Sequence, residues 1–139
     1  MDNCIFCEII KSVNLDDVIF QNERLLIMLD ADLAVKGHTM VIWKEHFENA
    51  SDLSQEEFAE FSEAVRKTEK ILLEELQLDK SVILKSGGLV SHFHFHIYPI
   101  PKDTSWEEVK NIFDKKVKYE YKGGEKNSLL VNLKKDFTL

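Results

Sequence analysis

The sequence contains little cysteine, proline or arginine, with two residues of each in a chain of 139. So few prolines argue against a linker-rich or disordered chain. The two arginines, Arg24 and Arg66, are too few for an arginine-rich phosphate clamp. No segment approaches the roughly 18 consecutive apolar residues that a membrane span requires. The formal net charge of −7 makes duplex DNA and anionic membranes poor candidate partners.

The N-terminal residues 1–4 lack the basic stretch and the apolar run of a signal peptide, so we expect a cytoplasmic protein. In that compartment both cysteines stay reduced, and a disulfide framework is not expected. The length suits one ordinary domain with its own apolar core. Because the chain shows no internal repeat and no boundary, we expect a single domain over residues 1–139.

Apolar periodicity and capping signals predict the secondary structure. Helices are expected over 54–77, where Ser54 and Glu57 form a capping box, and from Ser105 onward. Strands are expected on both sides of a turn at 21–23, and over 38–43, 81–84 and 90–100, with a terminal hairpin over 117–133. These elements predict an α+β fold, in which a mostly antiparallel sheet carries its helices on one face.

Three histidines share one face of the strand over 90–100. His92, His94 and His96 alternate with apolar residues such as Phe93 and Phe95, so the two sets of side chains project from opposite faces. A solvated face with three accidental histidines is the least favoured interpretation. The two functional interpretations are a tri-histidine catalytic metal site and nucleophilic catalysis by one imidazole.

Cys4 and Cys7 form a single C-x-x-C motif. In a cytoplasmic chain this motif is a redox pair, half of a metal site or a coincidence. A tetrahedral zinc site would need two further ligands from elsewhere in the chain.

Several segments together resemble the histidine triad (HIT) family of nucleotide hydrolases and transferases. The segment 92–98 fits the pattern His-φ-His-φ-His-φ-φ, where φ is apolar, and Cys4-Ile-Phe-Cys7 looks like the N-terminal segment of many bacterial members. Leu29-Asp30, Gly37-His38-Thr39 and Lys44-Glu45-His46 resemble further family segments. The likeness covers about residues 4–101 and leaves a divergent tail over 102–139. It implies a HIT-like fold with a five-stranded sheet, a main amphipathic helix and a shorter C-terminal helix.

The resemblance also implies catalytic roles for His92, His94, His96 and His38. His94, the central triad histidine, would attack the α-phosphorus of a purine nucleotide derivative, either a phosphoramidate or a dinucleoside polyphosphate. The nucleotidyl-histidine would then be hydrolysed by water. His96 would support the site, and His38 would complete the cluster from a neighbouring strand. A neutral imidazole is a competent nucleophile near pH 7.

In the family, the substrate contacts come from matching positions. Asp30 would bind the ribose hydroxyls, Phe6 and Leu29 would enclose the base, and the loop of Ser86, Gly87 and Gly88 would face the phosphate. Within this loop Gly88 stands where the family often has glutamine. We therefore also consider a nucleotide-binding protein with little or no turnover.

Zinc-binding members of the family take two further ligands from histidines at matching positions. The resemblance therefore implies a structural zinc held by Cys4, Cys7, His46 and His92. It also implies a homodimer.

Overall fold

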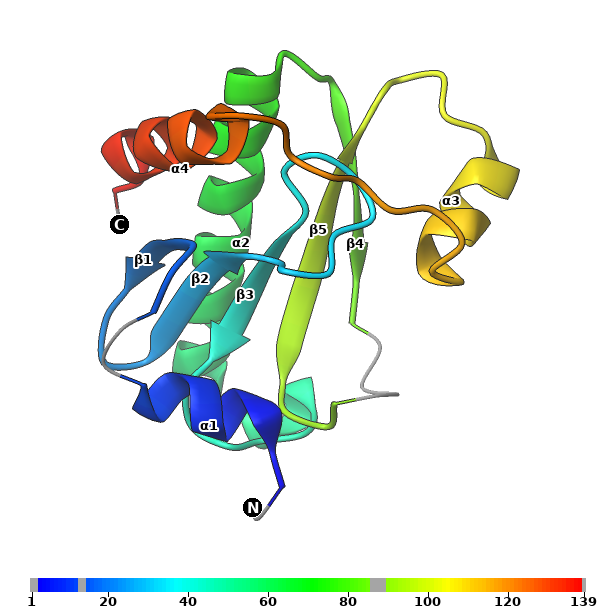
Figure 1. The fold of residues 1–139 in the computed structure, drawn as a ribbon. Helices are drawn as coiled ribbons and strands as arrows, with labels where there is room; N and C mark the ends of the chain where they lie inside the picture. The colour runs from blue at the N-terminus through cyan, green and yellow to red at the C-terminus, as the bar shows by residue number, and fades with distance from the viewer. Residues whose placement is uncertain (1–2, 13–14, 86–89, 139) are drawn as a thin grey trace.

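The computed structural model describes residues 3–12, 15–85 and 90–138, and a five-stranded sheet forms its centre (Figure 1). The strands lie in the order β1-β2-β3-β5-β4, and every neighbouring pair is antiparallel. The strands are β1 (Val18–Gln21), β2 (Leu25–Leu29), β3 (Thr39–Trp43), β4 (Lys80–Leu84) and β5 (His94–Ile100). The helices are α1 (Ile5–Lys11), α2 (Gln55–Leu76), α3 (Trp106–Phe113) and α4 (Glu125–Asp136), with a short 3₁₀ turn η1 (Ala50–Asp52). The predicted α+β class and HIT-like sheet are confirmed.

Helix α2 lies along one face of the sheet, as its sequence signals predict. Ser54 caps it: the Ser54 hydroxyl accepts from the Glu57 N–H, and the Glu57 carboxylate accepts from the Ser54 N–H. Gln77 ends the helix in the left-handed conformation. The apolar stripe of α2, including Phe61 and Leu72, packs against the sheet side chains that alternate away from the histidines.

The expectation that the helices cover one face only is wrong. Helices α2 and α4 lie on one face, whereas α1 and α3 cover the face that carries the histidines (Figure 1). That face also presents apolar side chains such as Leu26 and Ile42, and Phe6 of α1 buries them. Further along β5, Val109 and Ile112 of α3 pack on Tyr98. Apolar surface on both faces of a sheet needs a cover on both.

The predicted terminal hairpin is also wrong. The segment 117–122 forms no strand, and the residues after it form helix α4. Leu129 and Leu133, four positions apart, lie on one side of α4 and enter the core beside α2. None of the helices in the described ranges combines the length and apolar composition that crossing a bilayer requires.

Gly37 sets the entry into β3 and therefore the position of His38. Its φ of +82° is a conformation that glycine adopts without strain, and a Cβ at this position would lie 2.6 Å from a methyl carbon of Leu76. The His38 carbonyl then accepts a hydrogen bond of 2.9 Å from the Asp30 N–H. The close turn thus places a carboxylate and an imidazole at the same end of the sheet.

Candidate active site and metal centre

A pocket of about 700 Å³ opens on the histidine-bearing face between α1 and α3. Its floor carries Asp30, His38, His94 and His96. The walls are mostly apolar, and a concave apolar site with a few convergent polar groups is the usual form of a small-molecule site. The structure therefore brings together all but one of the histidines predicted to be catalytic. The other, His92, precedes β5 and turns its ring toward the two cysteines.

Three imidazoles in the pocket form one continuous hydrogen-bonded chain. The His38 Nε2 and His96 Nδ1 atoms are 2.9 Å apart, and His96 Nε2 is 3.1 Å from His94 Nε2. At one end of the chain, the Ala34 N–H donates to His38 Nδ1 across 3.2 Å. At the other end, His94 Nδ1 lies 2.6 Å from the His92 carbonyl oxygen. Main-chain groups therefore close both ends.

These two main-chain groups fix the tautomer of every imidazole in the chain. An N–H can only donate, so His38 Nδ1 accepts and its Nε2–H donates to His96 Nδ1. His96 Nε2–H then donates to His94 Nε2, and His94 Nδ1–H donates to the His92 carbonyl. Each ring donates once and accepts once, so all three imidazoles are neutral. His94 Nε2 is left with a lone pair, as a nucleophile requires.

Burial keeps these imidazoles neutral. It lowers the pKa of His38 to about 3, with smaller contributions from the neighbouring His96 and from Lys115. Burial likewise lowers the pKa of His96 to about 4, together with the nearby His94 and Lys115. The pKa of His94 is also lowered by burial, although the hydrogen bond to the His92 carbonyl opposes this shift.

Asp30 lies beside the chain, at the end of β2. Its Oδ2 is 3.4 Å from His38 Nε2 and 3.5 Å from His96 Nδ1, and its other oxygen accepts from the Asp32 N–H. Burial raises the pKa of the Asp30 carboxyl. A carboxylate on the floor of a pocket can accept hydrogen bonds from two vicinal hydroxyls, and a contact between Asp30 and a ribose stays a prediction.

Of the two residues predicted to enclose a base, Phe6 lines the pocket and Leu29 does not. Phe6 of α1 lines the pocket, and its ring centroid is 4.6 Å from that of His94 in an edge-to-face arrangement. Leu29 does not line the pocket, because alternation along β2 turns its side chain into the core beneath α2. Met28 and Met40 point the other way and supply the apolar wall instead.

The sequence analysis missed several pocket residues and named three that lie outside the described residues. Ser86, Gly87 and Gly88 are in the segment 86–89, so their predicted contact with phosphate remains a prediction. Two of the missed residues carry polar groups: Tyr98, on the face shared with the histidines, and Lys115, which follows α3. The alternation of β5 was a signal for Tyr98, whereas no local pattern indicates Lys115.

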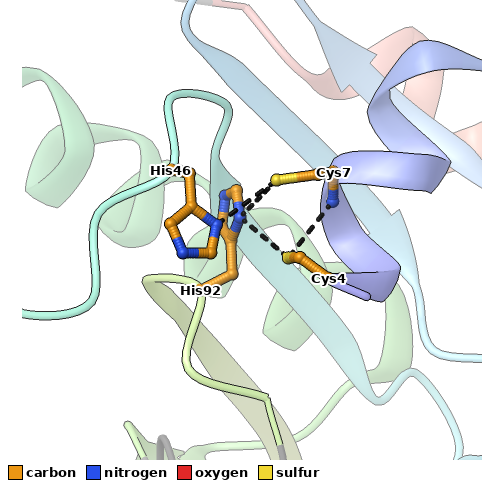
Figure 2. Close-up of side chains that lie close together, drawn as sticks. All are labelled: Cys4, Cys7, His46 and His92. Carbon is orange, nitrogen blue, oxygen red and sulfur yellow. Dashed lines mark hydrogen bonds between the residues drawn. The ribbon is translucent and has the colours of Figure 1, made fainter. Parts of the chain in front are cut away.

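A second cluster joins the N-terminal segment to the base of the histidine strand (Figure 2). The ligand atoms of Cys4, Cys7, His46 and His92 all lie within 4.8 Å of one another. His92 Nδ1 is 3.5 Å from the Cys4 sulfur and 3.6 Å from the Cys7 sulfur, and His46 Nδ1 is 3.3 Å from the Cys7 sulfur. His92 Nε2 lies 2.5 Å from the Trp43 carbonyl oxygen, which therefore accepts its N–H. The Nδ1 lone pair is thus directed at the sulfurs.

The hydrogen bonds of the histidine rings distinguish this cluster from a second group of possible metal ligands. Asp30, His38 and His96 also lie within 4.8 Å of one another. A metal-binding imidazole normally donates its remaining N–H to an acceptor, as His92 does to Trp43. His38 Nδ1 instead faces a donor, the Ala34 N–H, so its Nε2 carries a proton and cannot ligate. Two sulfurs and two imidazole nitrogens suit tetrahedral zinc, whereas the other cluster suits a hydrogen-bonded chain.

The tri-histidine metal site considered from sequence is not formed by the described residues. His92 Nδ1 faces the cysteines, His94 Nδ1 faces a carbonyl, and the three rings do not share a ligand position. The alternation did predict correctly that His94 and His96 share a face.

Comparison with known proteins identifies the family. The model of the HIT domain matches residues 11–104. An uncharacterized HIT-like protein of Methanocaldococcus jannaschii is 34% identical, and the match covers 86% of this chain and 99% of that protein. An adenosine 5'-monophosphoramidase of Schizosaccharomyces pombe is 33% identical, with 73% of this chain and 77% of that protein covered. A zinc-bound histidine triad family protein from Mycobacterium smegmatis shares the fold, with a TM-score of 0.73, 23% identity and coverage of 96% and 94%. The chain belongs to the HIT domain family.

Proposed function

We propose that the protein is a nucleotide hydrolase that acts at the α-phosphate through a nucleotidyl intermediate on His94. One observation carries this proposal: the chain of three neutral imidazoles ends on the His92 carbonyl and leaves His94 Nε2 unprotonated, so its lone pair can attack once it gives up the hydrogen bond from His96. The adenosine 5'-monophosphoramidase relative supports a nucleotide derivative as the substrate class.

The contacts of His94 support a two-step displacement. In the first step, His94 Nε2 forms a bond to the α-phosphorus, and the bond from phosphorus to the leaving group breaks with its electron pair. The imidazole becomes cationic, and the His92 carbonyl, which already accepts the Nδ1–H, stabilises that charge. The His96 Nε2–H loses its acceptor and is free to donate to a phosphoryl oxygen. In the second step, water displaces His94 and releases the nucleoside monophosphate.

The pocket supports binding of a nucleoside beside this nucleophile. Asp30, which lines the pocket, would accept hydrogen bonds from the ribose hydroxyls. Phe6, Met28 and Met40 form an apolar wall for the base. The loop with Ser86, Gly87 and Gly88 remains a proposed contact for the phosphate.

We further propose that Cys4, Cys7, His46 and His92 hold a structural zinc ion. The donor set of two thiolates and two imidazoles suits tetrahedral zinc, and it fills all four positions. Such a site has no open position for substrate. A bound zinc would supply a fixed connection between α1 and the start of β5, and the residues of this chain would perform the chemistry.

The assembly state is proposed from the family and from the free edge of the sheet. Strand β4 is the last strand of the sheet and exposes Ile83, whose relative accessibility is 41%. An uncovered edge strand with an apolar side chain is a candidate for pairing with a second copy. We propose a cytoplasmic homodimer, which sedimentation of the purified protein would test.

The central experiment is detection of the nucleotidyl adduct. The protein is exposed briefly to adenosine 5'-phosphoramidate or a diadenosine polyphosphate, and intact mass is measured beside AMP release. The wild type and the surface variant Glu107→Gln should gain the mass of one AMP group, and His94→Ala should not. Undiminished turnover by His94→Ala would exclude His94 as the nucleophile. Nucleotide binding without turnover of either substrate would favour the alternative, a binding protein without catalytic activity.

A further inference from the structure

The wall of the pocket opposite α1 comes from residues that follow the segment 11–104 matched by the HIT domain model. Ile112 and Phe113 at the end of α3 line it with apolar surface, and Lys115 lies beyond them. Lys115 has a φ of +57°, so the backbone turns sharply after the helix. This turn sets a lysine side chain at the rim of the pocket, on the side away from Phe6.

Lys115 is the single lysine or arginine among the described residues that line the pocket. Its Nζ is 3.6 Å from one oxygen of Asp32, and Lys118 Nζ is 3.9 Å from the other oxygen. Two ammonium groups share one carboxylate, so this group of three side chains keeps a net positive charge. Both arginines form ion pairs elsewhere, with Glu60 and Glu63.

The positive charge of Lys115 reaches the imidazole chain. After burial and the neighbouring imidazole, Lys115 is the next influence that lowers the pKa of His38 and of His96. It also acts on Asp30, where it opposes the rise in pKa that burial causes. Because Lys115 lines the same pocket as these three groups, its ammonium can act on a phosphate bound in that pocket.

The two proposed substrate classes differ in what stabilises the leaving group as it departs. When His94 Nε2 bonds to the α-phosphorus, the breaking bond leaves its electron pair on the departing atom. A departing amine must also gain a proton. Of the three imidazoles, His94 is the one that becomes cationic at this stage, and its remaining proton is held by the His92 carbonyl. A departing phosphate keeps the electron pair as an anion and needs a positive charge nearby instead.

We propose that Lys115 is a specificity-determining residue that binds the phosphate of the leaving group and makes the enzyme prefer leaving groups that depart as phosphate anions over amines. This inference rests on the proposed hydrolase function. If it is right, dinucleoside polyphosphates are better substrates of this protein than phosphoramidates. The apolar surface of Ile112 and Phe113 beside Lys115 suits the base of a second nucleoside.

The test compares two substrates in three variants. Diadenosine tetraphosphate and adenosine 5'-phosphoramidate are assayed for kcat/KM with Lys115→Gln, Lys115→Arg and the neighbouring surface variant Lys116→Ala. Glutamine keeps most of the side-chain length and has no special conflict with the backbone at this position, so the folded structure should persist. We expect Lys115→Gln to lower kcat/KM for the tetraphosphate about tenfold. For the phosphoramidate, kcat/KM should stay within about twofold of the wild-type value. Lys115→Arg should retain most of the activity, and Lys116→Ala should match the wild type.

The salt dependence gives a second, independent measurement. With the wild type, kcat/KM for the tetraphosphate should fall as the salt concentration rises, and this slope should become shallower in Lys115→Gln. The inference is overturned if Lys115→Gln lowers kcat/KM equally for both substrates, or for neither of them. Failure of the proposed function has a different signature, because the wild type would then turn over neither substrate.

Discussion

Replacement of Cys7 by serine should release α1 from the sheet while the rest of the fold persists. The helix has seven residues, and isolated helices of this length do not persist in water. Ordering seven residues costs at least about 7 kcal/mol in backbone entropy. Burial of the Phe6 side chain, which is 6% exposed, contributes about 2–3 kcal/mol. The remaining stabilisation has to come from the partly buried residues of α1 and from the four-ligand cluster at its N-terminal end.

Loss of α1 should also weaken nucleotide binding, because Phe6 forms part of the proposed base site. Stacking of a base on an aromatic side chain contributes about 1–3 kcal/mol, so we expect the Kd for AMP to rise about tenfold or more in Cys7→Ser. The assays are zinc content by mass spectrometry, hydrogen exchange of the α1 amides, and AMP binding by calorimetry. Amides of α2 serve as the internal reference, since their protection should not change.

The matched control is Glu8→Gln, in the same turn of α1. Glu8 is exposed and belongs to neither cluster, so this variant should keep its zinc, its α1 protection and its affinity for AMP. The reasoning is refuted if Cys7→Ser retains a full equivalent of zinc. It is equally refuted if zinc is lost and the α1 amides remain as protected as in the wild type.

Three further predictions concern stability. Ser54→Ala removes the hydrogen bond that the Glu57 N–H donates to the Ser54 hydroxyl at the start of α2, and it should lower the free energy of unfolding by about 1 kcal/mol, as measured in urea. Gly37→Ala places a methyl group 2.6 Å from Leu76 at a φ of +82°, and we expect a loss of about 1–3 kcal/mol; an unchanged urea midpoint would contradict the close approach. Acid should also destabilise the fold. The pKa values of His38 and His96 are about 3 and about 4, below the value of about 6.5 expected when unfolded, so the unfolded chain binds more protons between these values. The contribution of each ring to stability is therefore complete above pH 6.5 and falls by about 1.4 kcal/mol per pH unit below it. Urea titrations at pH 7 and pH 5 test this, and equal unfolding free energies would show that the rings are not buried neutral.

Local sequence signals predicted those parts of the fold whose causes are themselves local. The capping box at Ser54 and the apolar periodicity after it located α2 to within one residue at each end. The tail was mispredicted because the alternation of Val117, Tyr119 and Tyr121 has no strand to pair with. The spacing of Leu129 and Leu133 indicates a helix. That helix forms, with Gly124 directly before its first residue.

In the candidate site, sequence predicted which residues meet but not how they are oriented. Alternation placed His94 and His96 on one face, and the same rule applied to β2 would have turned Leu29 away from the pocket. The tautomers depend on the Ala34 N–H, which the loop before Gly37 brings to His38. Lys115 enters the pocket through a packing contact between α3 and the sheet, and no pattern within α3 specifies that contact.

The hydrogen-bonded imidazole chain has a consequence for how this protein can change its substrates. The direction in which its hydrogen bonds are donated is set at both ends by main-chain groups, the Ala34 N–H and the His92 carbonyl, which a side-chain substitution does not remove. The tautomer of His94, the proposed nucleophile, therefore depends on the fold of the main chain. A side chain of the apolar wall, such as Met28, can vary without changing that tautomer. Under the proposed function, the chemistry and the choice of substrate would depend on different residues, and one reactive centre could serve differently shaped pockets.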